Sequence, residues 1–133
     1  MSKSALSSKV FCVYLFVVGP VLVIAPNVLL ALFGMPPSTE VWIHRIGVLA
    51  IALGVYGWVG ADHRLMLQAS VYVRAMFFAA CLTFAAMGLA SPMIVVFGLI
   101  DLLGGLWTHF ALSADARANR PVAGLLPVVA GRR

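Results

Sequence analysis

Four long apolar runs occupy most of this 133-residue sequence. A helix that crosses a bilayer core of about 30 Å needs about 20 consecutive, mainly apolar residues. Hydrophobic residues make up 63% of the chain and charged residues only 10%, too few polar groups to cover a water-soluble globule. The sequence therefore predicts an all-α fold, an antiparallel bundle of four transmembrane helices.

The apolar runs also predict the limits of the domain and of its helices. We expect one transmembrane domain over residues 1–113, followed by a basic cytoplasmic tail over 114–133. Ser38 or Thr39 is expected to cap the second span, with Glu40 in its first turn. The four spans are expected over about 9–25, with an apolar extension to 33, and over about 40–61, 69–90 and 92–112.

Two local patterns refine this picture. Gly19-Pro20 lies inside the first run and predicts a kink in a continuous helix. The third and fourth runs are separated by very few residues, so their helices are expected to form a tight antiparallel hairpin.

The basic residues predict the orientation of the bundle, because cytoplasmic loops and tails are enriched in Lys and Arg. Seven of the nine basic residues fall on one side of the predicted bundle: Lys3, Lys9, Arg64, Arg117, Arg120, Arg132 and Arg133. The outer loops contain none. We therefore expect both termini in the cytoplasm, and we interpret the net charge of +5 as a topology signal rather than a nucleic-acid-binding surface.

Three charged residues lie within the predicted spans: Arg45, Arg74 and Asp101. An ionised side chain at the centre of a span costs about 2.5–3.5 kcal/mol on insertion scales, so such residues usually face the bundle interior and find partners. We expect Asp101 near the middle of the membrane, with one arginine on either side. The sequence thus predicts a buried polar cluster of these three residues.

The cluster has two interpretations. It either fixes the register of the helices or forms a functional site, with Asp101 as a proton or cation site or the arginines as an anion site. Small residues favour close helix packing on two faces, within the chain or between copies of it. These residues are Gly47, Ala50, Gly54, Gly57 and Ala61 in the second span, and Gly98, Gly105 and Thr108 around Asp101 in the fourth.

Glu40, His44 and His109 are further polar candidates that could support this cluster. We expect His44 to pair with Glu40 one helical turn earlier. His44 and His109 are expected at opposite ends of the bundle, roughly 20 Å apart, so they cannot bind one haem. No metal-binding spacing occurs and Cys12 and Cys81 are far apart, so we predict neither a metal site nor a cofactor.

Short motifs resemble the small bacterial four-helix membrane proteins called DoxX-like and BphX-like. The resemblance rests on a Pro-containing loop before Arg45-Ile46-Gly47, on Arg74 near the start of the third span, and on Asp101-Leu-Leu-Gly104 in the fourth. It covers residues 33–113. The resemblance implies a four-helix bundle in the bacterial inner membrane and does not supply catalytic residues.

Two functions from different classes fit these features. The first is an accessory or scaffolding subunit that packs against a larger membrane complex. The second is a homo-oligomeric channel or transporter for a small anionic or polar solute. An enzyme is less favoured, because no nucleophile, general base or redox centre can be recognised and we assign no catalytic residue. The expected partners are the lipid bilayer and either a membrane protein or further copies of the chain.

Overall fold

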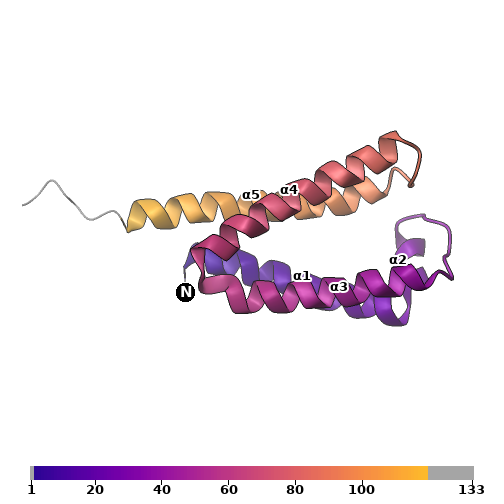
Figure 1. The fold of residues 1–133 in the computed structure, drawn as a ribbon, viewed down its shortest axis with the longest axis horizontal. Helices are drawn as coiled ribbons and strands as arrows, with labels where there is room; N and C mark the ends of the chain where they lie inside the picture. Colours follow the sequence, from indigo (N-terminus) through magenta and orange to yellow (C-terminus); the bar gives the residue numbers. More distant parts are fainter. Residues whose placement is uncertain (1, 120–133) are drawn as a thin grey trace, which may run out of the picture.

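A computed structural model describes residues 2–119, and every regular element in this range is a helix (Figure 1). In chain order these are α1 (Lys3–Ile24), α2 (Pro26–Leu32), α3 (Val41–Val59), the 3-10 helix η1 (Gly60–Asp62), α4 (Arg64–Ala86) and α5 (Ile94–Ala118). Four segments are long and apolar enough to cross a membrane: α1, α3 with η1, α4 and α5. The predicted all-α fold with four spanning helices is confirmed.

The spanning helices form two antiparallel pairs, α1 with α3 and α4 with α5 (Figure 1). The pairs join mainly through α1 and α5, whereas α4 makes little contact with α1 or α3. In Figure 1 the pairs lie closest at the end that holds the N-terminus and spread apart toward α2. At that wider end Phe33 stacks on Phe97 of α5, with ring centroids 4.1 Å apart.

Glycines allow α1 and α3 to pack backbone against backbone. A Cβ added to Gly47 would lie 2.7 Å from the Gly19 carbonyl oxygen and 2.8 Å from the Val23 nitrogen. Further along α3, Gly54 faces the Phe16 ring in the same way. In a membrane, burying apolar side chains between helices contributes little free energy, because lipid tails are equally apolar. Close approach of the backbones instead provides the van der Waals contacts that hold two helices together.

The pairing of α4 with α5 uses the small-residue face of α5. A Cβ on Gly98 would lie 3.0 Å from Cys81 Cβ, and one on Gly105 would lie 3.4 Å from Arg74 Cβ. Gly88 has a φ of 69° in the connection between the two helices, a conformation that glycine adopts without steric cost. The predicted antiparallel hairpin is present, but its connection covers residues 87–93 and is longer than expected, because α4 ends at Ala86 and α5 begins at Ile94. The small-residue faces of α3 and α5 pack within the chain.

The first helix begins earlier than expected, at Lys3 rather than near residue 9. Ser2 caps it, with its hydroxyl oxygen accepting the Ala5 N–H at 3.1 Å. The helix continues through Pro20, as predicted, and stops at Ala25, after which Pro26 occupies the first turn of α2. The apolar extension is therefore a separate short helix.

Other boundaries also differ from the prediction. Glu40 itself is the N-cap of α3 and makes no side-chain capping hydrogen bond, so the cap expected from Ser38 or Thr39 is wrong. The helix α4 begins at Arg64, five residues before the apolar run. The helix α5 continues to Ala118, so the first residues of the predicted tail are helical. Residues 120–133 of that tail lie outside the described range.

The α1–α3 contact predicts a specific sensitivity at Gly47. The Gly47→Ala substitution should lower the stability of the detergent-solubilised protein by about 1–3 kcal/mol, because backbone atoms of α1 fill the space the methyl group needs. Leu49→Ala is the matched control, since this side chain is 63% exposed on the same helix. Equal melting temperatures for the two variants would contradict the packing described.

Candidate functional site

Arg74 is the only charged side chain that is buried in the described part of the chain, with 5% of its surface exposed. It lies ten residues after the start of α4, roughly 15 Å along the helix axis, and so closer to mid-helix than predicted. On α5, a Cβ at Gly104 would come within 3.1 Å of Arg74 Nη1. The glycines at 104 and 105 thus make the space that the arginine occupies.

Two groups face the buried guanidinium. Its central carbon lies 3.7 Å from the centroid of the Phe11 ring on α1, and Nη1 donates a hydrogen bond of 3.3 Å to Thr108 Oγ1 on α5. The negative face of an aromatic ring attracts a cation, most strongly where water is excluded. Arg74 of α4 therefore joins α1 and α5 at one point.

A chain of hydroxyl groups continues from Thr108 toward the N-terminal end of α1. The Ser7 hydroxyl lies 3.1 Å from Thr108 Oγ1 and 2.8 Å from the carbonyl oxygen of Ser4. The Thr108 hydroxyl also donates to the Gly104 carbonyl, at 3.0 Å. Both hydroxyl residues are almost fully buried, and the network satisfies polar groups that would otherwise be costly in a bilayer.

The chain ends at the carboxylate of Asp115, near the end of α5. Ser4 donates to it twice, from its hydroxyl at 2.6 Å and from its backbone N–H at 3.0 Å, and the Lys3 N–H donates at 3.3 Å. A carboxylate at a helix N-terminus satisfies free N–H groups and interacts favourably with the helix dipole. Asp115 therefore fastens the start of α1 to the end of α5.

The structure places Arg45 apart from the other two residues of the predicted cluster, whereas Arg74 and Asp101 lie on the packed helices α4 and α5. Arg45 is exposed on α3, with its guanidinium 4.7 Å from the Trp42 ring centroid. Asp101 is half-buried on α5, one turn before the glycines that face Arg74. Because α3 packs on α1 rather than on α5, Arg45 and Asp101 belong to different helix pairs. Only Arg74 lies in the hydrogen-bonded chain described above.

The supporting residues also have partners other than those expected. His44 does not pair with Glu40, because its Nδ1 donates to the Val23 carbonyl at 2.7 Å, at the C-terminal end of α1. Glu40 is exposed, and its N–H donates to Ser38 Oγ at 3.2 Å. His109 is exposed beside Phe110. Within residues 2–119, no three His, Cys, Asp or Glu side chains are grouped so that they could hold a metal ion.

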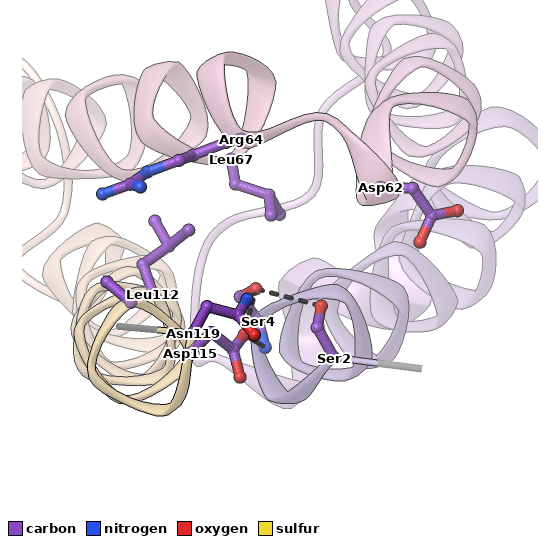
Figure 2. A pocket seen from close by; sticks show the side chains of 9 residues that line it. Ser2, Ser4, Asp62, Arg64, Leu67, Leu112, Asp115 and Asn119 are labelled. Atoms are coloured by element: carbon purple, nitrogen blue, oxygen red, sulfur yellow. Dashed lines mark hydrogen bonds between the residues drawn. The ribbon is translucent and has the colours of Figure 1, made fainter. Parts of the chain in front are cut away.

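A cleft of about 340 Å³ opens where the hydroxyl chain reaches the end of the bundle (Figure 2). Figure 2 shows Ser4 and Asp115 side by side, while the Arg64 side chain is directed away from Asp62. The lining combines hydroxyl, amide and carboxylate groups with the apolar side chains of Leu67 and Leu112. The buried arginine is thus linked by hydrogen bonds to a polar opening at the N-terminal end of the bundle.

The hydrogen-bonded chain of Thr108, Ser7, Ser4 and Asp115 that begins at Arg74 was not predicted. The sequence carried a usable signal, since Ser4, Ser7 and Phe11 recur at steps of three and four and therefore lie on one helical face. The prediction missed it by starting the first span near residue 9, which left the serines outside the membrane.

These features define the class of the protein. Four spanning helices and a buried arginine held by Thr108 and Phe11 identify a multi-pass helical membrane protein. Comparison of the chain with protein-family models, with curated proteins and with solved structures found no significant match.

The contact between Arg74 and Thr108 predicts a non-additive pair of substitutions. Thr108→Val should lower stability by about 1–3 kcal/mol, because it leaves a buried charged donor without its acceptor. Adding Arg74→Met should recover part of this loss, since the charge is then removed as well. Thermal unfolding of both single variants and the double variant in one detergent measures the coupling. If the stability loss of the double variant equals the sum of the losses of the two single variants, the contact between Arg74 and Thr108 is contradicted.

The carboxylate of Asp115 predicts a second, independent effect. Asp115→Asn should lower the melting temperature of the protein, because an amide interacts less favourably than a carboxylate with the N-terminus of α1. Asp62→Asn is the control, since it removes an exposed carboxylate from η1 at the same end of the bundle. If both variants unfold at the temperature of the wild type, the stabilising contact between Asp115 and the N-terminus of α1 is contradicted.

Proposed function

We propose that this protein is an accessory or scaffolding subunit of a larger membrane complex. The observation that carries the proposal is the exposed position of Arg45. This arginine lies four residues into α3, stacked on Trp42, which is also exposed, and directed away from the interior of its own chain. Charged residues within spans normally face protein or water rather than lipid, so a neighbouring membrane protein is the surface that suits Arg45.

The interior of the chain supports the same function. Arg74 is held by Phe11 and Thr108, and Asp115 by the N-terminus of α1. These contacts join helices of one chain, and a structural role for Arg74 follows directly from them. Large apolar side chains cover the outer faces of all four spanning helices, which suits packing against lipid and against another membrane protein.

We further propose that the protein resides in the bacterial inner membrane with both termini in the cytoplasm. The start of α1 and the end of α5 lie at the same end of the bundle (Figure 1). Lys3, Arg64 and Arg117 are at or near that end, as expected for a cytoplasmic side. The resemblance to DoxX-like proteins favours the same location.

A homo-oligomeric channel or transporter for a small anionic or polar solute is the second candidate. One observation favours it. Arg74 is a buried cation within a span, and intramembrane charges of this kind often mark the path of a solute.

Purification of the tagged protein from its native membrane separates the two functions. An accessory subunit should retain a stoichiometric membrane protein, and Arg45→Gln should reduce that partner several-fold because it removes the exposed charge. Arg117→Gln is the matched control, since it removes a charge from the opposite end of the bundle. Mass spectrometry of the purified material measures the ratio.

Two results would overturn the proposal. The first is a homo-oligomer without a protein partner that conducts a small anion in proteoliposomes, with flux abolished by Asp101→Asn; this result would establish the transport function. The second is full retention of the partner by Arg45→Gln, which would show that Arg45 simply extends toward the lipid headgroups.

A further inference from the structure

A second groove, of about 210 Å³, lies between α4 and α5; it shares Arg64 and Leu112 with the cleft in Figure 2, and its other lining residues differ. Arg64, Gln68 and Tyr72 line it from α4, at steps of four residues that place them on one helical face. His109 and Ser113 line it from α5, also four residues apart. Five polar side chains from two helices therefore converge on one groove.

The lining favours an anionic ligand. Gln68, Tyr72 and His109 each carry at least one N–H or O–H donor, and Arg64 is permanently charged. The Ser113 hydroxyl donates to the His109 carbonyl at 3.1 Å. Arg64 also lines the cleft of Figure 2 together with Asp62 and Asp115, whereas no carboxylate lines the groove between α4 and α5. In Figure 2 the Arg64 side chain is directed away from Asp62. A guanidinium in such surroundings is suited to bidentate binding of phosphate.

The position of the groove indicates where such a phosphate comes from. Arg64 is the first residue of α4, and Tyr72 lies eight residues further, roughly 12 Å into the span. Val71 and Leu112 form apolar walls, and Tyr72 is 76% exposed. The groove thus begins at the membrane surface and runs along an apolar face, as a lipid headgroup and its acyl chains require.

We propose that this groove binds the phosphate headgroup of an anionic phospholipid. Arg64 provides the main contact with the phosphate, and Gln68, Tyr72 and His109 provide donors for the remaining headgroup and ester oxygens. The inference goes beyond the proposed subunit function and does not depend on it, because lipid binding can be measured on the isolated protein.

Native mass spectrometry of the purified full chain tests the proposal, with phosphatidylglycerol and phosphatidylcholine added in separate titrations. The wild type should bind phosphatidylglycerol more tightly than phosphatidylcholine. Arg64→Gln should weaken phosphatidylglycerol binding about fivefold or more, as expected for one basic residue at a lipid headgroup. Arg117→Gln, which removes an equal charge from α5 outside the groove, should leave binding unchanged.

Arg64→Lys and competition with inorganic phosphate complete the test. The lysine variant keeps the charge without the planar fork, so it should bind with intermediate affinity. Since Arg64 is exposed, each variant should melt at nearly the wild-type temperature. Equal weakening by Arg64→Gln and Arg117→Gln would show unspecific charge attraction and overturn the proposal. Equal binding of the two lipids, or displacement by inorganic phosphate at the lipid concentration, would also overturn it.

Discussion

The burial of one arginine in a membrane-spanning helix is the constraint on which much of this structure depends. A guanidinium keeps its charge at any working pH and is costly to place in hydrocarbon. The surrounding helices must therefore provide space, an aromatic face for the cation and hydrogen-bond acceptors. Gly104 and Gly105 provide the space, Phe11 the aromatic face and Thr108 the acceptor. These groups come from α1 and α5, which are the helices that join the two pairs.

The hydroxyl chain extends this constraint to the N-terminal end of the bundle. Ser7 and Ser4 carry the hydrogen bonds from Thr108 to Asp115, whose carboxylate fastens the start of α1 to α5. Toward α2 the pairs spread apart and meet through an aromatic contact between Phe33 and Phe97 (Figure 1). The polar contacts that join α1 to α5 thus belong to the N-terminal half of α1.

The sequence predicted the spanning helices, a first span that continues through Pro20, and the antiparallel hairpin, because hydropathy and proline placement are local properties. It could not predict which helices pair. The expected cluster assumed that Arg45 on α3 would meet Asp101 on α5, yet the glycines of α3 direct that helix onto α1. Arg74 was correctly singled out as a charge within a span, but Thr108 and Ser7, its polar surroundings, are uncharged and gave only a weak signal.

The most direct test of this account is disulfide formation between Ser7→Cys and Thr108→Cys in isolated membranes, with Cys12 and Cys81 replaced by alanine. The two hydroxyl oxygens are 3.1 Å apart, so the introduced thiols should crosslink rapidly with a mild oxidant and change the mobility of the chain on a gel. The control pair is Val17→Cys with Thr108→Cys. Val17 lies ten residues beyond Ser7 on α1, roughly 15 Å further along the helix, and is 61% exposed. Crosslinking of the first pair alone would support the joining of α1 to α5 beside Arg74. Failure of that pair to crosslink, or equal crosslinking of both pairs, would contradict it.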